Sequence, residues 1–229
     1  MCYPAAMQSD SVRGSALSTD DLLKAYTLGY FPMSEGRDDP DIFWVLPEYR
    51  GILRLEDFHF PRSLKKAVRQ DRIEIRVDTA FRETMLGCAA PATGRHETWI
   101  NDRILETYCA LFEQGHAHSV EAWQGGDLVG GLYGVSIKGA FFGESMFSRV
   151  TDASKIALVH LVGRMKAGGY RLLDTQFHTS HLGQFGVTEI PKVGYQILLE
   201  DALRVEGNFF ALPRQIDGST MAQSITQMS

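Results

Sequence analysis

The sequence has few cysteines, no long apolar run and no excess of positive charge. Cys2, Cys88 and Cys109 form no CxxC pair, so an odd set at these spacings predicts neither a disulfide framework nor a zinc site. No segment approaches the roughly 18 consecutive apolar residues of a membrane-spanning helix, and the N-terminus does not join a basic region to an apolar stretch. We therefore expect a cytoplasmic protein with reduced thiols.

The net charge of −5 argues against sequence-independent binding of long nucleic acids, which requires a strongly basic domain. One segment, PRSLKKAVRQDRIEIR, is nevertheless locally basic. Its basic residues recur at steps of three and four, the spacing of one helical face: Arg62, Lys65, Lys66, Arg69, Arg72 and Arg76. Such a face is either simply solvated or contacts phosphates, and the pattern alone leaves both interpretations open.

Several well-known site motifs are missing. The sequence contains no Walker loop, no G-x-G-x-x-G and no G-x-S-x-G elbow, which argues against ATP, NAD and an activated serine. The histidine pairs in HAH (116–118) and HTSH (178–181) lack a third ligand in a recognised zinc pattern. We expect neither a metal nor a cofactor and interpret these histidines as structural.

The order of expected elements predicts an α+β fold. Hydrophobic residues make up 44% of the chain, enough for a sizeable core. Helices are expected at about 19–28, from Pro61, and at about 79–88, 101–114, 152–167 and 195–204; strands are expected at 42–46, 50–57, 73–78 and 170–177. Between them, 118–123, 128–137 and 140–147 predict an antiparallel meander joined by tight turns. A meander, a buried helix, a strand and a closing helix fit the fold of acetyl-CoA-dependent N-acyltransferases.

Four parts of the chain are expected. Residues 1–16 and 213–229 are polar and aperiodic, which predicts flexible ends. Between them we expect a small N-terminal α+β domain (17–60) and a GNAT-like C-terminal domain (61–212) with a mixed, largely antiparallel sheet.

Three polar residues stand out among apolar neighbours. Side chains two apart in a strand point to the same side, so Asp174 and Gln176 of LLDTQ should face together. Glu144 lies in a glycine-rich run of the meander, where missing side chains let a backbone or a ligand approach. The three groups either converge in an apolar site or are separate, satisfied structural residues.

A series of motifs now points to one family. These are AYTLGYFP, FWVLP, HFPRSLKK, TWIND, GHAHSVEAW, LVGGLYGVSIKGAFFGESMFSR, ASKIAL, LLDTQ and EIP, spread over about 19–210. Together they resemble the leucyl/phenylalanyl-tRNA–protein transferases, and GHAHS joined to GESMFSR at this separation is highly specific.

The resemblance implies an enzyme without a cofactor. It would transfer leucine or phenylalanine, with methionine as a further donor to consider in this chain, from aminoacyl-tRNA to the N-terminal α-amine of proteins beginning with Arg or Lys, marking them for degradation. The family's active-site positions fall on Glu144, Asp174 and Gln176. We assign Gln176 to orienting the amine, Asp174 to accepting its proton directly or through Gln176 and water, and Glu144 to offsetting the incoming positive charge.

The resemblance also implies substrate-binding residues. Trp44 and Trp99 fall near the 3′ adenosine, and the pocket for the transferred side chain falls on Leu132, Phe141, Met146, Ala157, Leu161 and Leu173. The basic face from Arg62 to Arg76 would bind acceptor-stem phosphates. Thr179, in the segment after Gln176, is a further substrate-binding position. Better-known relatives carry Asn in place of Thr179, an aromatic residue in place of Leu161 and a hydroxyl-bearing residue in place of Ala157. The acceptor and donor preferences of this chain therefore stay open.

Two other functions are weighed against this one. An acetyl-CoA-dependent acyltransferase would carry a glycine-rich pyrophosphate loop before its central helix, and SRVTDASK has no glycine there. A non-catalytic tRNA-binding adaptor would not need Glu144, Asp174 and Gln176 together.

Overall fold

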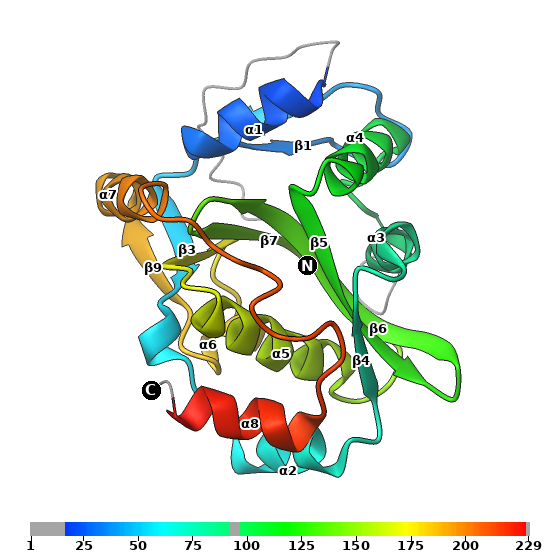
Figure 1. The fold of residues 1–229 in the computed structure, drawn as a ribbon. Coiled ribbons are helices and arrows are strands. Elements are labelled where there is room, and N and C mark those ends of the chain that lie inside the picture. Colours follow the sequence, from blue (N-terminus) through cyan, green and yellow to red (C-terminus); the bar gives the residue numbers. More distant parts are fainter. Residues whose placement is uncertain (1–16, 92–96, 228–229) are drawn as a thin grey trace.

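The computed structural model describes residues 17–91 and 97–227 (Figure 1). The helices are α1 (Thr19–Thr27), the 3-10 helix η1 (Leu55–Asp57), α2 (Arg62–Gln70), α3 (Phe81–Ala89), α4 (Asp102–Glu113), α5 (Ala153–Ala167), α6 (Ser180–Gly183), α7 (Lys192–Ala202) and α8 (Gly218–Gln227). The strands are β1 (Phe31–Met33), β2 (Phe43–Val45), β3 (Tyr49–Leu53), β4 (Glu74–Val77), β5 (Ala117–Gln124), β6 (Asp127–Ile137), β7 (Ala140–Ser148), β8 (Leu172–Gln176) and β9 (Thr188–Pro191).

One seven-stranded sheet organises the fold, in the order β4-β5-β6-β7-β8-β3-β9. All its neighbours are antiparallel except β7 and β8, which run parallel. The predicted meander is confirmed as β5-β6-β7, and so is the prediction of an α+β fold with a mixed, largely antiparallel sheet. Strands β1 and β2 form a separate two-stranded ribbon beside α1 (Figure 1).

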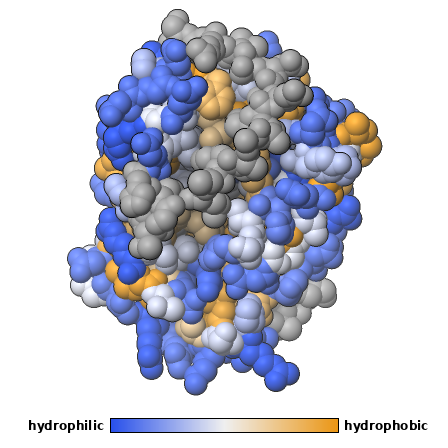
Figure 2. All heavy atoms as spheres, turned by 180° about the vertical axis from the view of Figure 1, so that it is seen from behind, coloured by the Kyte–Doolittle hydropathy of each residue, from blue (hydrophilic) through white to orange (hydrophobic). Residues whose placement is uncertain are grey.

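The helices cover both faces of this sheet (Figure 1). Helix α5 lies against one face, and α3, α4 and α7 lie on the other, with α1 beyond them. A hydrophobic cluster fills each side. Helix α5 is buried on nearly all sides because α8 and α2 pack on the side that faces away from the sheet. Seen from behind, the described surface is mostly hydrophilic, with only small hydrophobic areas (Figure 2).

Local sequence explains where several helices begin. The side chain of Ser18 accepts a hydrogen bond from the backbone N–H of Asp21, and the acidic first turn of α1 suits the positive end of the helix dipole. Asn101 caps α4 in the same way by accepting from the N–H of Ile104 at 2.8 Å. The predicted helix starts at 19 and 101 are therefore confirmed to within a residue.

The C-terminal segment differs from the expectation of a flexible tail over 213–229. Residues Gly218–Gln227 form α8, which buries Met221, Ala222 and Ile225 against α5 and α2. The buried guanidinium of Arg164 donates to the backbone carbonyls of 212, 213 and 214 and so fixes the chain that leads into α8. The buried residues of α8 recur at helical spacing, but most residues around them are polar, so the sequence did not predict this helix. The flexible N-terminus expected at 1–16 lies outside the described residues.

Two further points concern the N-terminal part of the chain. Strand β3, from the segment assigned to a separate small domain, lies inside the large sheet between β8 and β9. The expected strand over 50–57 is shorter, because η1 follows β3 directly. Within the described ranges, no helix is both long and apolar enough to cross a membrane.

Candidate active site

Glu144 lies at an irregularity of the β6–β7 pairing. Tyr133 is opposite Ser145 and Gly134 is opposite Gly143, so Glu144 is an extra residue with no partner across the ladder. Such a bulge turns a side chain away from the regular alternation and is common beside active sites. Here it directs the Glu144 carboxylate to the side of the sheet that carries α1 and α4.

Two tyrosines hold the Glu144 carboxylate. The hydroxyl of Tyr26 (α1) donates to Oε1 at 2.6 Å, and that of Tyr108 (α4) donates to Oε2 at 3.1 Å. The two hydroxyls also contact each other, and both tyrosines are fully buried. Burial raises the pKa of Glu144 to about 7, the two hydroxyls act to lower it, and the nearby Asp174 adds to the rise. A carboxylate with this pKa can gain and lose a proton near neutral pH.

Gln176 ends β8 in a strained conformation. Its φ is 54°, which is uncommon for a residue other than glycine, and the N–H of Phe177 donates to the carbonyl of Thr175 across this tight turn. The side-chain Nε2 donates to Glu144 Oε1 at 3.1 Å. Because an ionised carboxylate only accepts, the amide nitrogen must face Glu144, and the amide oxygen is left to accept from another group. Strain of this kind is concentrated at functional sites.

Asp174 is buried under a set of donors. Its Oδ1 accepts from Arg50 Nε at 2.8 Å and from the backbone N–H of Gln176 at 2.8 Å. Its Oδ2 accepts from Arg50 Nη2 at 2.6 Å and from the hydroxyl of Tyr195 at 2.6 Å. The side chain has no exposed surface. Glu144, Gln176 and Asp174 are thus brought together as one connected group, but only the first two reach an open space.

That space is a pocket between the β1–β2 ribbon and the sheet. Its lining consists of Phe31, Pro32, Met33, Trp99, Glu144, Gln176 and Phe177. The apolar walls with one carboxylate and one amide fit a small-molecule or chain-end site. Of the two tryptophans predicted near the adenosine, Trp99 lines the pocket. Trp44 lies one strand behind it, opposite Pro32 in the ribbon.

The residues predicted to hold the transferred side chain lie together on the α5 side of the sheet. Five of them are buried in one hydrophobic cluster: Leu132, Phe141, Ala157, Leu161 and Leu173. The sixth, Met146, is partly buried and packs against the same cluster. They come from β6, β7, β8 and α5. The structure brings these positions together, on the face of the sheet opposite to Glu144.

Other singled-out residues have structural roles. His118 Nδ1 lies 2.8 Å from Asp78 Oδ2, and its ring stacks on Phe209 at 4.0 Å, which confirms the interpretation of this histidine as a structural residue. Thr179 caps α6 by accepting from the N–H of Leu182. Gly130 leaves room for α5, since a Cβ there would lie 2.5 Å from that of Ala153. In the described ranges no cluster of three or more His, Cys, Asp or Glu side chains could hold a metal ion.

Comparison with known proteins decides the family. The model of the leucyl/phenylalanyl-tRNA protein transferase N-terminal domain matches residues 15–48, and that of the leucyl/phenylalanyl-tRNA protein transferase matches residues 52–200. The chain belongs to the leucyl/phenylalanyl-tRNA protein transferase family. Relatives of that name include proteins from Phenylobacterium zucineum (58% identical over 84% of this chain and 87% of the relative) and Afipia carboxidovorans (54% over 93% and 95%). A third, from Maricaulis maris, is 54% identical over 92% of this chain and 97% of its own length.

Sequence reasoning missed several residues of this transferase-family site. Arg50, Tyr26, Tyr108 and Tyr195 hold the two carboxylates but were not singled out. The arginine in the otherwise uncharged strand YRGIL could have indicated a buried carboxylate nearby, because an arginine is rarely buried without a charged partner. The tyrosines gave no signal, since an aromatic residue at helical spacing is typical of any core.

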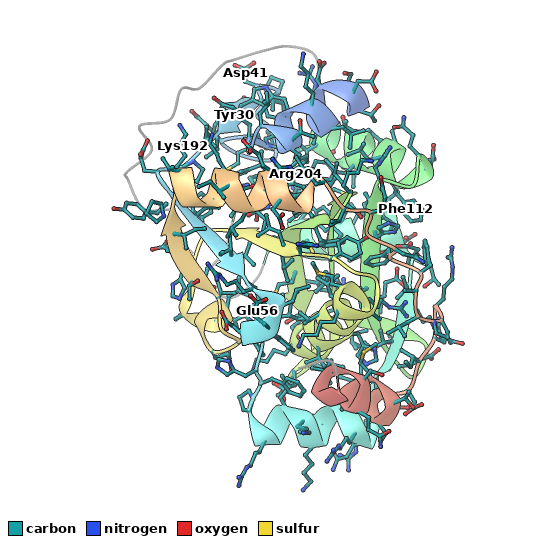
Figure 3. The ribbon with its side chains drawn as sticks, turned by 60° about the vertical axis from the view of Figure 1, so that its left-hand side comes forward. Tyr30, Asp41, Glu56, Phe112, Lys192 and Arg204 are labelled. Atoms are coloured by element: carbon teal, nitrogen blue, oxygen red, sulfur yellow. The ribbon has the colours of Figure 1, made fainter. Side chains whose placement is uncertain are left out.

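The basic residues lie far from the pocket in this member of the family. Helix α2 and β1 are at opposite ends of the molecule (Figure 1), and nitrogen-tipped side chains extend from α2 into solvent (Figure 3). Arg62, Lys66 and Arg69 are exposed along α2, and Arg72 is exposed just after it. Arg76 instead pairs with Glu74 at 2.9 Å and stacks on Trp123. Lys65 is half-buried beside them.

Proposed function

We propose that this protein transfers leucine or phenylalanine, with methionine as a further donor, from an aminoacyl-tRNA to the free N-terminal amine of a protein. The observation that carries the proposal is the Glu144–Gln176 pair in the apolar pocket, where a carboxylate with a pKa of about 7 touches an amide whose oxygen is left to accept. The family membership supports the same reaction.

The reaction needs positioning and one proton carrier. The α-amine, with a pKa of about 7.7–8.0, is partly neutral at working pH. Its nitrogen attacks the ester carbonyl carbon, a C–N bond forms and the bond from that carbon to the ribose oxygen breaks. The amine loses one proton and the ribose oxygen gains one, so a single group that accepts and returns a proton completes the balance. The ester is already activated, and no ATP is required.

Glu144 is the best placed of the three residues to carry that proton. Among the residues that the structure describes, Tyr108 alone donates to its Oε2, and the carboxylate borders the pocket. Gln176 orients the incoming amine through its amide oxygen. Asp174, which the sequence suggested as the proton acceptor, is less suited to that task, because Arg50, Tyr195 and Gln176 already occupy both its oxygens; its task is to hold Gln176 in place.

The tRNA would be bound at two places. Trp99, supported by Trp44, stacks on the terminal adenosine. The pairing of β7 with β8 ends at Phe142 and Asp174, and beyond it the donor side chain passes between the two strands to the apolar cluster around Leu161 and Ala157 on the other face of the sheet. The exposed basic face of α2 binds phosphates of the acceptor stem at the far end of the molecule. This separation suits an elongated RNA and reconciles tRNA binding with a net charge of −5.

The acceptor is proposed to begin with Arg or Lys. Glu144 supplies negative charge at the pocket, and the segment 34–41 that leads from β1 toward β2 carries Glu35, Asp38, Asp39 and Asp41. Thr179 lies close by in sequence after Gln176, where the altered segment bears on acceptor choice. A cytoplasmic location is proposed because the substrates are tRNA and protein N-termini.

The test is transfer of labelled leucine from leucyl-tRNA, without ATP or acetyl-CoA, to three peptides that differ only at the N-terminus: Arg, Asp or acetylated Arg. We expect labelling of free Arg alone. Labelling of Asp would overturn the acceptor assignment but keep the reaction, whereas no labelling of any peptide would favour a tRNA-binding adaptor. A parallel reaction with acetyl-CoA in place of leucyl-tRNA completes the test, and acetylation of a peptide there would favour an ordinary acyltransferase.

A further inference from the structure

Arg50 is a buried side chain that connects Asp174 to Phe31 in the pocket wall. It is 1% exposed, and its guanidinium lies between the rings of Phe31 at 4.6 Å and Tyr195 at 4.7 Å. Its Nη1 donates to the carbonyl of Gly29 at 3.0 Å, while Nε and Nη2 make a fork to the two oxygens of Asp174. Each of its three nitrogens therefore donates to an acceptor, which fixes the plane of the guanidinium.

The fork orients the Asp174 oxygen that holds Gln176. Oδ1 accepts the backbone N–H of Gln176, the residue with a φ of 54°. The next residue along β3, Gly51, lies so close to the turn that a Cβ there would meet the carbonyl carbon of Phe177 at 2.5 Å. Arg50 and Gly51 thus contact the strained turn from two sides, one through Asp174 and one by close packing.

We propose that Arg50 is a positioning residue for the transfer reaction: through Asp174 it holds Gln176 in the left-handed turn that presents the Gln176 amide to the amine, and through Phe31 it fixes the pocket wall. This role rests on the proposed function. It assigns Asp174 to the same task, as the link between Arg50 and the turn, and it predicts that a charge alone at position 50 is insufficient.

Arg50→Lys is the first test, because it keeps the positive charge but loses the geometry. A single ammonium group cannot make the two parallel bonds to Asp174 and also bond the Gly29 carbonyl. We expect kcat for leucine transfer to the Arg peptide to fall at least tenfold, with KM for leucyl-tRNA within about twofold of wild type. Tyr170→Phe is the control. It removes a buried hydroxyl that bonds Ser136 rather than Asp174 or Gln176, so its kcat should stay within about threefold.

A second variant separates positioning from stability. Replacing a buried ion pair by apolar residues commonly preserves folding, so Arg50→Met with Asp174→Leu should fold and bind leucyl-tRNA. If Arg50 is a positioning residue, kcat of this double variant should be at least tenfold below wild type although its Tm is near wild type. If the ion pair is purely structural, kcat should recover together with the Tm. Arg50→Lys at more than half the wild-type kcat, or a double variant with restored rate, would overturn the proposal. Inactive wild-type and Tyr170→Phe proteins would instead reject the transferase function itself.

Discussion

Replacing Tyr26 by Phe should move the pH dependence of transfer. The change deletes the 2.6 Å hydrogen bond to Glu144 Oε1 and leaves the ring in place among its apolar neighbours. That bond lowers the pKa of Glu144 against the effect of burial, so its removal should raise a pKa that is already about 7. Tyr108 would still donate to the other oxygen.

The size of the shift can be worked from the bond. A hydrogen bond to a charged group contributes roughly 1.5–3 kcal/mol, and one pKa unit corresponds to about 1.4 kcal/mol. The Glu144 pKa in the variant should therefore lie roughly one to two units higher. At pH 7 the ionised fraction falls from about one half to a tenth or less, so the rate should drop roughly five- to fiftyfold. At pH 9 the ionised fraction should recover to roughly one half to nine tenths, and the rate with it.

The assay is the initial rate of leucine transfer to one Arg peptide at saturating leucyl-tRNA, from pH 5.5 to 9.5 at constant ionic strength, corrected for spontaneous ester hydrolysis. Using the same peptide throughout keeps the ionisation of the acceptor amine identical for all variants. Tyr170→Phe is the control, since its hydroxyl bonds Ser136 and not Glu144. An equal loss at every pH, or a midpoint that moves downward, would refute the assignment of Glu144 as the proton acceptor.

Three further predictions concern stability, tRNA and the donor. In the wild type, the folded pKa of Glu144, about 7, exceeds the unfolded value of 4.5, so the bound proton stabilises the folded state and this effect is lost as pH rises through 7. Glu144→Gln has no such proton to lose, so its free energy of unfolding relative to wild type should rise by about 2–3 kcal/mol from pH 5 to pH 8. Parallel curves of Tm against pH for the two proteins would contradict this. Lys65 and Lys66 changed to Ala should raise the tRNA dissociation constant and flatten its salt dependence, while Lys138→Ala should do neither; an unchanged slope would remove α2 from the interface. Ala157→Leu should lower kcat/KM for phenylalanyl-tRNA more than for leucyl-tRNA, because it fills the buried cluster; equal losses would place the donor elsewhere.

The sequence predicted most of the sheet and helices but only part of the site. Period-two and period-3.6 patterns located β5, β6, β7 and the long helices, since these segments bury one continuous face. Short elements such as β1, β9 and α6 carry too few residues for a pattern. Helix α8 was missed because its buried stripe lies within a polar segment.

At the site, alternation correctly placed Asp174 and Gln176 on one side of β8. It could not reveal that Arg50, 124 residues earlier, occupies the Asp174 carboxylate. A partner so distant along the chain is set by the pairing of β3 with β8, which no local pattern encodes. The same limitation applied to Glu144, whose outward turn depends on a one-residue shift between β6 and β7.

The most direct test is single-turnover transfer by Glu144→Gln, with leucyl-tRNA bound to excess enzyme and the Arg peptide added to start the reaction. If Glu144 carries the proton, the rate of peptide-bond formation should fall about 10²–10⁴-fold while the dissociation constant for leucyl-tRNA stays near wild type. A rate within about threefold of wild type would show that another group carries the proton and would contradict the account.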